Sequence, residues 1–268
     1  MFSSFLRIAI FCGVIIFAAC VEAQTPITIC ADPQNPPFST RQKTGFENKI
    51  AEAIAAELHQ PVRFYWSRLG RGFVREVVNK GQCDALVAIP VGMRGLLVTA
   101  PYYRSTYVFV TRANDKSVNS LDDSRLQNMK IGVQVLDDDY APPARALARR
   151  HLTKNIVGFD MDENAGAIID AVARKKVDAA IVWGPLAGYY AKRYGNILHL
   201  DPVTPELDPP LLSFTYENAV GVRKSEPELF ARFNSAIQRA QPKIRSILRQ
   251  YNVPTLPLTR STAERTGQ

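Results

Sequence analysis

Glycine is scarce in this sequence, with 15 residues in 268, and 46% of the residues are apolar. Disordered and low-complexity chains hold too few apolar residues to bury a core, and collagen-like chains need glycine at every third position. All three classes are therefore excluded. The length is sufficient for one large domain or two modest ones.

The first apolar run, residues 8–19, is too short to span a bilayer as a helix, which requires about 20 residues. It follows Arg7 and precedes Val21-Glu22-Ala23, which places small residues at the two positions that a signal peptidase reads. We expect a signal peptide over residues 1–23, cleavage before Gln24 and export to the periplasm. The alternative is a lipoprotein anchored at Cys20, although Phe17-Ala18-Ala19-Cys20 departs from the lipobox at its first position.

Cysteine is rarer still, with four residues, and only Cys30 and Cys83 remain after the expected cleavage. An even pair in an oxidising compartment favours a disulfide. However, Cys30 ends one expected strand and Cys83 precedes another, so parallel pairing would hold their α-carbons beyond the bridging limit of about 7 Å. The sequence leaves the bond open, and strand geometry argues against it. There is no Cys-x-x-Cys motif for redox chemistry or haem attachment.

Signatures of catalysis and of metal binding are also missing. There is no Gly-x-Ser-x-Gly, no His-Glu-x-x-His, no phosphate-binding loop and no dinucleotide-binding glycine turn. The three histidines (His59, His151 and His199) share no metal-ligand spacing. We therefore expect no catalytic residue, no metal and no cofactor. The net charge of +8 favours anionic partners, but export and the lack of a recognition motif exclude nucleic acid.

Strand and helix patterns alternate along the chain, which predicts an α/β fold with mostly parallel sheets. Two half-patterns recur, Gly81-Gln82-Cys83-Asp84-Ala85-Leu86 and Lys176-Val177-Asp178-Ala179-Ala180-Ile181, and each follows a predicted helix. Two similar lobes with a ligand cleft between them are expected, with chain crossings near Arg112 and Phe214. The expected divisions are 24–112 and 213–254 for lobe 1, 113–212 for lobe 2, a proline-rich linker at 201–210, a helical stretch at 226–250 interrupted at Pro242, and a polar, frayed tail at 255–268.

Several short motifs resemble bilobed extracytoplasmic solute-binding proteins, which deliver polar amino acids to ABC transporters. They include Pro36-Pro37-Phe38, Gly45-Phe46-Glu47 and Pro101-Tyr102-Tyr103. A narrower resemblance, carried by Cys30-Ala31-Asp32-Pro33, Arg71-Gly72-Phe73-Val74-Arg75 and Val182-Trp183-Gly184-Pro185-Leu186, is to binding proteins associated with quinoprotein dehydrogenases. This resemblance implies a type II periplasmic-binding-protein-like fold. It also implies a non-catalytic accessory of a PQQ-dependent methanol or alcohol dehydrogenase and its c-type cytochrome.

Departures from the amino-acid-binding pattern indicate a different ligand. The Thr-x-x-Arg that grips an α-carboxylate is absent, and Arg94 lies seven residues before Pro101 instead of about nine. Where the second lobe usually offers an anion-binding Gly-Thr turn, this chain has Asp137-Asp138-Asp139. The alternatives to the accessory role are thus a binding component of an ABC permease for some other small polar solute, or an enzyme similar to cyclohexadienyl dehydratases. That enzyme needs an acid and an arginine, for which the sequence offers Glu47 and Arg94.

Aromatic and polar residues at expected strand ends are the candidates for a ligand- or partner-binding cleft. Trp183 ends an expected strand on the side where α/β sites form. Tyr102 and Tyr103 are expected to divide between core and cleft, and the basic face of the helix over residues 142–151 to be a solvated surface that steers a partner. The full set is Asp32, Phe38, Glu47, Arg94, Tyr102, Tyr103, Gln134, Asp137, Tyr140 and Trp183.

Overall fold

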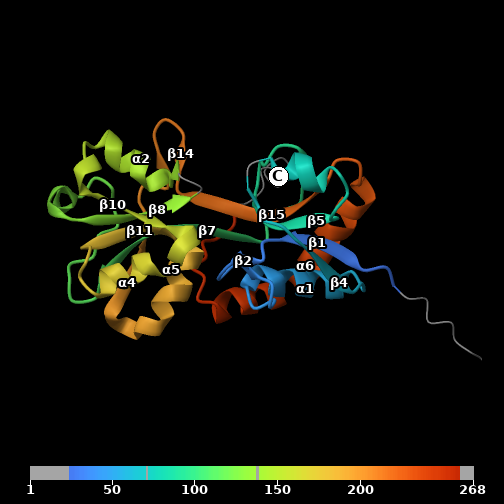
Figure 1. Ribbon diagram of the computed structural model, residues 1–268. Coiled ribbons are helices and arrows are strands. Elements are labelled where there is room, and N and C mark those ends of the chain that lie inside the picture. The colour runs from blue at the N-terminus through green and yellow to red at the C-terminus, as the bar shows by residue number, and fades with distance from the viewer. Residues whose placement is uncertain (1–23, 71, 137–138, 260–268) are drawn as a thin grey trace, which may run out of the picture.

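The computed structural model describes residues 24–70, 72–136 and 139–259 (Figure 1). The expected signal peptide, Asp137 and residues 260–268 lie outside the described residues. Within the described part, no helix is long and apolar enough to cross a membrane. The described part forms two α/β lobes side by side, joined by long strands that run from one to the other.

One sheet continues through both lobes in the order β10-β8-β11-β7-β15-β5-β1-β4. The pairs β1–β4, β1–β5, β8–β10 and β8–β11 are parallel, whereas β7 and β15 pair antiparallel with their neighbours. The expected α/β class is confirmed. The strands are β1 (Ile27–Ala31), β4 (Val62–Trp66), β5 (Ala85–Pro90), β7 (Tyr103–Arg112), β8 (Ile131–Leu136), β10 (Ile156–Asp160), β11 (Ala179–Trp183) and β15 (Thr215–Arg223), with β6 (Leu96–Val98), β9 (Asp139–Tyr140) and β12 (Leu198–Pro202) attached to β15, β8 and β7.

In lobe 1, helices α1 (Phe46–Glu57) and α6 (Pro227–Gln250) pack side by side against the sheet. The spacing of Phe46, Ile50 and Ile54 in the sequence places them on one stripe of α1, and all three are buried. The interruption predicted at Pro242 is wrong, since α6 runs through it. A proline inside a helix costs about 3 kcal/mol, and buried apolar side chains on both sides of it offset that at about 1.5–3 kcal/mol each. They are Phe233, Ile237, Ile244, Ile247 and Leu248.

Lobe 2 buries both faces of its sheet, which explains the nearly unbroken apolar sequence of β11. Helix α2 (Pro142–Arg149) covers one face, whereas α4 (Ala167–Ala173) and α5 (Gly184–Ala191) cover the other. Short elements complete the chain: β2 (Gln34–Asn35), β3 (Ser39–Thr40), the π-helical turn η1 (Val74–Val78), η2 (Ser124–Asn128), η3 (Thr153–Asn155), α3 (Met161–Asn164), η4 (Lys192–Ile197), β13 (Leu207–Asp208) and β14 (Leu212–Ser213).

The two lobes meet where β7 changes partner. Its first residues, through Thr106, pair with β15, and from Tyr107 onward it pairs with β11 and β12. The segment after α6 lies alongside this crossing, where the Ser105 hydroxyl donates to the Pro254 carbonyl (2.6 Å). Leu256 pairs with Arg104, and the backbone N–H of Thr259 donates to Glu217 (2.8 Å). The expectation of a frayed tail is therefore wrong for residues 255–259.

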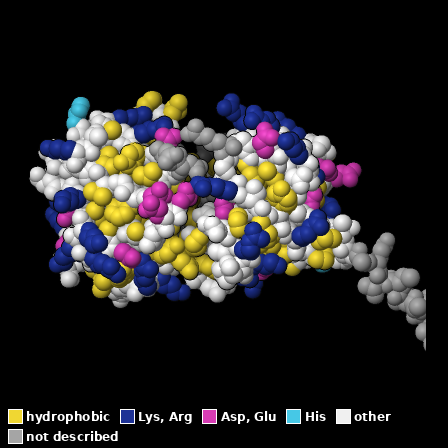
Figure 2. Space-filling view, in the orientation of Figure 1, with side chains coloured by type: hydrophobic (Ala, Val, Ile, Leu, Met, Phe, Trp, Pro, Cys, Tyr) yellow, Lys and Arg dark blue, Asp and Glu magenta, His cyan; other side chains and the backbone are white. Residues whose placement is uncertain are grey.

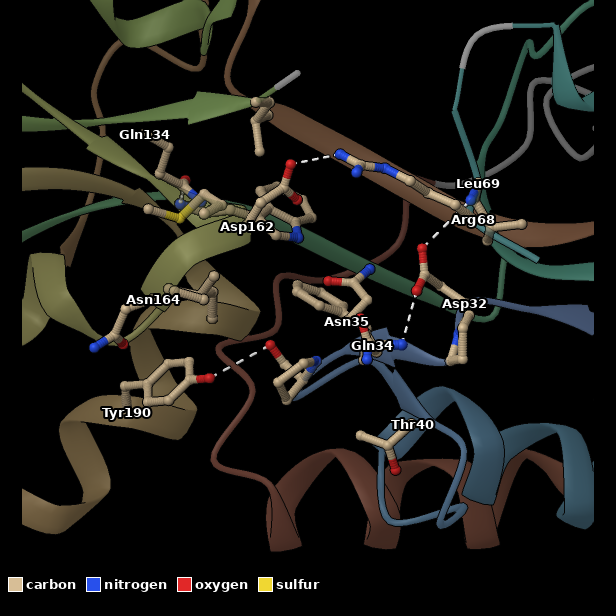
Figure 3. A pocket seen from close by; sticks show the side chains of 18 of the residues that line it. Asp32, Gln34, Asn35, Thr40, Arg68, Leu69, Gln134, Asp162, Asn164 and Tyr190 are labelled. Carbon is tan, nitrogen blue, oxygen red and sulfur yellow. Dashed lines mark hydrogen bonds and ion pairs between the residues drawn. The ribbon is translucent and has the colours of Figure 1, made fainter. Parts of the chain in front are cut away.

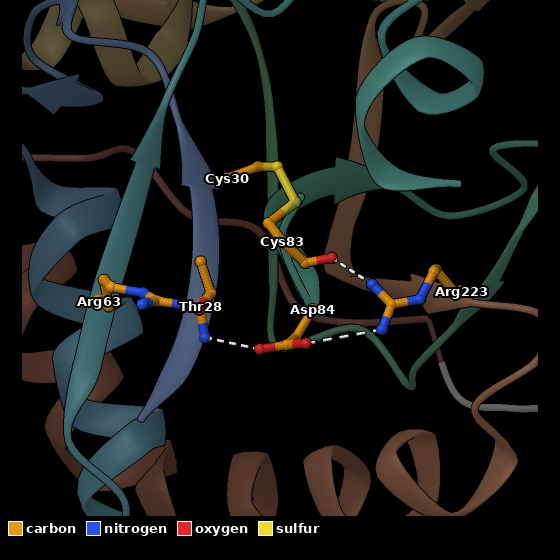
Figure 4. The surroundings of a disulfide bond; sticks show 6 residues. All are labelled: Thr28, Cys30, Arg63, Cys83, Asp84 and Arg223. Carbon is orange, nitrogen blue, oxygen red and sulfur yellow. Dashed lines mark hydrogen bonds and ion pairs between the residues drawn. A yellow bond between two sulfur atoms is a disulfide. The ribbon is translucent and has the colours of Figure 1, made fainter. Parts of the chain in front are cut away.

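Cys30 and Cys83 form a disulfide, contrary to the strand argument (Figure 4). Cys30 is in register with Leu86 of β5, so a straight extension of β5 would place Cys83 about 10 Å away at 3.3 Å per residue. Instead the chain bends before β5, and the two α-carbons are 5.4 Å apart. Asp84 holds the bend by accepting from the backbone N–H of Thr28 (2.7 Å), while Arg223 donates to the Cys83 carbonyl.

The stretch expected to be a linker folds back as the β13–β14 hairpin, which is anchored on α2. The Asp208 carboxylate is buried and accepts from Arg149 (3.1 Å) and Arg150 (2.8 Å). The hydrogen bond from the Arg150 side chain, aided by the charge of that residue, holds the pKa of Asp208 below its usual value. The expectation that these arginines form only a solvated surface is therefore wrong, because a buried carboxylate is stable only when it is paired.

Candidate functional site

A cavity of about 1050 Å³ lies between the lobes (Figure 3). The turn after β1 and the turn after β4 supply its lobe 1 wall, which includes Asp32 and Arg68. Lobe 2 supplies Gln134 from β8, Asp162 from α3 and Trp183 from the end of β11. The expected cleft is thus present, at the carboxyl ends of parallel strands, where ligands of α/β proteins bind.

Two contacts bridge the mouth of this cleft. Arg68 and Asp162 form an ion pair at 2.5 Å, and the Tyr190 hydroxyl donates to the Pro36 carbonyl at 3.5 Å. In Figure 2, acidic and basic side chains face each other across the groove between the lobes. Both members of the ion pair are more than half exposed. Exposed ion pairs contribute only about 0–1 kcal/mol to stability. This pair therefore joins the two lobes but adds little to the stability of that arrangement.

Three aromatic rings meet on the lobe 2 side of the cleft. The Trp183 ring contacts those of Tyr107 and Tyr216, with centroids 5.4 and 5.6 Å apart. The backbone N–H of Trp183 donates to the buried Gln134 side chain (2.6 Å), which fixes the start of α5. Trp183 therefore has a well-defined position while one side of its ring system faces the cavity.

A second cavity of about 850 Å³ opens beside Trp183, and its walls come almost wholly from lobe 1. Its lining is mainly apolar, with rings from Phe38, Phe73 and Tyr103 and aliphatic groups from β5. Glu47 and Arg94 line the same cavity. Pockets that are largely apolar and hold a few polar groups are the usual form of small-molecule sites.

Glu47 is the acidic residue whose pKa is shifted most among the described residues of the second cavity. It lies in the first turn of α1, and no described residue bonds to its carboxyl group. Burial, aided by the nearby charge of Asp32, raises the pKa of Glu47 to about 8. Groups shifted in this way inside a cavity are candidates for function.

The backbone of this second cavity is irregular as well. Ala88 adopts a left-handed conformation (φ 55°) at a bulge, where Val87 and Ala88 together face one residue of β15. A non-glycine residue in this region is strained, and such strain is common at functional sites. The π-helical turn η1 forms another wall, and such turns are also frequent at functional sites. The sequence carried no local signal for the bulge, because an alanine in an apolar run fits a regular strand.

The structure brings most of the expected site residues together. Asp32 and Gln134 line the first cavity, Glu47, Arg94 and Tyr103 line the second, and Phe38 and Trp183 line both. Tyr102 lines neither, because its hydroxyl accepts from the backbone N–H of Ala88 (2.8 Å) inside the lobe 1 core. Tyr140 lines neither cavity and is half exposed on β9, and Asp137 lies outside the described residues. Sequence reasoning missed Arg68, Phe73, Ala88, Asp162, Tyr216 and Asn218.

The described residues contain no cluster of histidine, cysteine, aspartate or glutamate that can hold a metal ion. Arg94 is exposed, and no described residue forms an ion pair with it. Arg94 is therefore not a buried arginine of the kind that binds the α-carboxylate of an amino acid. In this respect the cavities differ from a site built for an α-amino acid.

Comparison with known proteins agrees with this architecture. The family model for bacterial extracellular solute-binding proteins, family 3, matches residues 27–253. The chain is 30% identical to the protein MoxJ of Methylorubrum extorquens over 257 residues, which cover 87% of this chain and 82% of that protein. It is also 30% identical to MoxJ of Paracoccus denitrificans over 252 residues, with 87% and 90% covered.

Solved structures give the same result. The periplasmic binding protein XoxJ from Methylobacterium extorquens AM1 superposes with a TM-score of 0.70 at 35% identity, covering 87% of this chain and 100% of XoxJ. MxaJ from Methlophaga aminisulfidivorans MPT superposes with a TM-score of 0.76 at 25% identity, covering 86% and 100%. The resemblance read from the motifs is confirmed. The chain belongs to the bacterial extracellular solute-binding proteins of family 3.

Proposed function

We propose that this protein is a non-catalytic periplasmic accessory of a PQQ-dependent methanol or alcohol dehydrogenase. In this role it contacts the dehydrogenase or its c-type cytochrome through the mouth of the cleft. The observation that carries the proposal is the combination of MoxJ-, MxaJ- and XoxJ-type relatives with a cleft that has no buried arginine among its described residues. Export through a cleaved signal peptide is part of the proposal.

Trp183 and Phe38 are the proposed anchors for the partner. Both line the two cavities and are partly buried, so each ring is held in place and retains a free side. Rigid aromatic anchors near the centre of an interface often dominate its energy. Arg149 and Arg150, at the end of α2, form ion pairs with Asp208. Of the three arginines expected to steer a partner, Arg145 therefore keeps that role in the proposal. Such steering changes the association rate more than the affinity.

The test is association of the purified protein with purified dehydrogenase and cytochrome, followed by biolayer interferometry. Trp183→Ala is expected to lower affinity at least tenfold at both low and high salt. The matched control is Trp66→Ala, because Trp66 stacks on Phe64 and lines neither cavity. Arg145→Glu is expected to slow association at low salt only. Absence of binding by the unaltered protein at low salt would overturn the proposal.

Binding of a small solute is a second candidate, and the two cavities favour it. With volumes of about 1050 and 850 Å³, they are large enough for one small molecule each. A solute raises the thermal unfolding temperature of the isolated protein through mass action, whereas a protein-binding accessory needs its partner for this effect. Thermal shift of the isolated protein with candidate solutes therefore separates the two functions.

A further inference from the structure

We propose that the second cavity, beneath Trp183, is a site for a small protonated amine with an apolar body. In this site the N–H groups of the amine bond to the Glu47 carboxylate, and its charge lies against aromatic rings. The inference goes beyond the accessory role and does not depend on it. It rests on three features of the described part of the cavity: the carboxyl group of Glu47, to which no described residue bonds, the sign of the described charges nearby and the aromatic walls.

The first feature is the carboxyl group itself. The backbone N–H of Glu47 donates to the Phe38 carbonyl (2.9 Å), which fixes the start of α1, whereas no described residue bonds to its side chain. A carboxylate that leaves water without gaining hydrogen bonds is strongly disfavoured. An ammonium group supplies both the opposite charge and up to three N–H donors. An ammonium group therefore supplies the hydrogen-bond donors and the positive charge that no described residue supplies to Glu47.

The second feature is the set of charged groups around Glu47. Asp32, after β1, is the described charge that acts on it most strongly, and it is also acidic. Tyr102 and Tyr103, at the start of β7, remain neutral because burial raises their pKa values far above neutrality. Arg75 on η1 pairs with Glu76, and its side chain is 81% exposed. Arg94, in the turn after β5, is also exposed.

Anionic ligands are disfavoured by this arrangement. A carboxylate placed beside Glu47 would meet two acids, while the two basic side chains among the described residues of the lining, Arg75 and Arg94, are exposed. A cation at the same place is favoured, because both acids attract it. The charge pattern therefore selects for a positive head group beside Glu47, whose side chain is partly buried.

The third feature is the aromatic lining. Phe38, Phe73, Tyr103 and Trp183 come from four different segments and line one cavity. Faces of aromatic rings attract cations, and aromatic walls are a general device for binding organic ammonium groups. The same rings, with the aliphatic side chains of β5, provide the apolar surface that covers the body of the ligand. A volume of about 850 Å³ accommodates a molecule of this size.

Binding of the amine is coupled to proton release. With the pKa of Glu47 at about 8, the empty cavity holds the carboxyl group mainly in its protonated form at pH 7. An ammonium ion favours the ionised form, so binding of the cation at pH 7 releases a proton from most of the molecules. The affinity then rises with pH by nearly tenfold per unit below pH 7 and levels off above pH 8.

The experiment is isothermal titration calorimetry of the purified protein with n-butylammonium chloride from pH 6 to pH 9. Each pH is measured in two buffers of different ionisation enthalpy, which reports the protons released. We expect binding that strengthens at least thirtyfold from pH 6 to pH 8, together with proton release at pH 7. The neutral analogue 1-butanol and the anion butyrate are expected to bind at least tenfold more weakly at pH 8.

Two variants on the same helix separate the site from the fold. Glu47→Gln keeps the shape of the side chain and is expected to lose both the pH dependence and the proton release. Glu52→Gln, which removes a carboxylate paired with Lys49 outside the cavity, is expected to bind as the unaltered protein does. Circular dichroism confirms that both variants are folded.

Three outcomes would overturn the inference: no detectable binding of n-butylammonium by the folded protein at pH 8, equal binding by Glu47→Gln, or binding of 1-butanol that matches the amine and weakens above pH 8. The last result would mean that protonated Glu47 acts as a hydrogen-bond donor to a neutral ligand. Because no dehydrogenase or cytochrome is present, each of these results leaves the accessory role untouched.

Discussion

The backbone carbonyl oxygen of Asn252 lies only 1.9 Å from the point where a β-carbon on Gly188 would stand. Gly188 belongs to α5 of lobe 2, and Asn252 follows α6 of lobe 1. The Asn252 side chain also donates to the Gly188 carbonyl (2.9 Å). Gly184, one turn earlier in α5, is in a similar position: a β-carbon built on it would lie 2.5 Å from the Thr106 carbonyl oxygen. The lobes are thus in backbone contact away from the cleft, in addition to the crossing strands.

Gly188→Ala is expected to destabilise the protein by about 1–3 kcal/mol, because the new methyl group forces α5 away from Asn252. In a helix without this contact, the same change stabilises by about 0.5–1 kcal/mol. Urea unfolding measures the difference. Gly70→Ala is the control, because nothing lies within 4 Å of its added β-carbon. Equal or greater stability of Gly188→Ala would contradict the close contact.

Removal of the Cys30–Cys83 disulfide is expected to cost about 4 kcal/mol, because it closes a loop of 53 residues in the unfolded chain. The double variant Cys30→Ala, Cys83→Ala measures this by urea unfolding. Both cysteines are only 1% exposed, so the folded protein is expected to react slowly with reductant. A denaturation midpoint of the unaltered protein that does not move with reductant would show that the bond is absent.

Asp208→Asn is expected to destabilise lobe 2 by about 3 kcal/mol, because Arg149 and Arg150 lose their buried counter-charge. The pKa of Asp208 is lowered in the folded state, so its contribution is present above the unfolded value of 3.8. It is lost as the pH falls through the lower folded pKa. The stability difference between Asp208→Asn and the unaltered protein is therefore constant from pH 7 to pH 5 and shrinks below pH 4.

The control for that measurement is Asp122→Asn, because Asp122 also pairs with Arg150 but its side chain is 69% exposed. Exposed pairs of this kind contribute about 0–1 kcal/mol. If Asp122→Asn and Asp208→Asn cost the same, the hairpin is not anchored through its buried carboxylate.

Common α-amino acids are expected to bind no better than millimolar. The α-carboxylate finds no buried arginine among the described cavity residues, and Glu47 and Asp32 repel it. Two or three missing charge-assisted hydrogen bonds, at about 1.5–3 kcal/mol each, weaken a micromolar site by several orders of magnitude. Calorimetric titration with glutamate, glutamine and arginine tests this. Micromolar affinity for any of the three would refute it.

Much of the fold could be predicted because its signals are local. The alternating strand and helix patterns predicted the α/β class, and the stripe of Phe46, Ile50 and Ile54 forms the buried face of α1. Side-chain periodicity depends only on backbone geometry and on which face is buried, so it can be read from neighbouring residues. The placement of Trp183 at a strand end followed from the same reasoning.

The errors all concern residues that are distant in sequence. Pro242 breaks a helix in isolation, yet the packing of α6 on α1 keeps that helix intact. Arg149 and Arg150 look like surface charges until the hairpin brings Asp208 to them from 58 residues away. The division expected for Tyr102 and Tyr103 is not among these errors, because Tyr102 packs in the core and only Tyr103 lines a cavity.

The sequence by itself determined the family, the α/β class, the order of most elements and seven of the described residues that line the two cavities. Only the tertiary structure decided the disulfide, the ion pair between Arg68 and Asp162, the bulge at Ala88 and the isolation of Glu47. The physical reason is that periodicity and turn chemistry act over a few residues. A bend held by Asp84 or a carboxyl group left without a partner depends on every segment that packs around it.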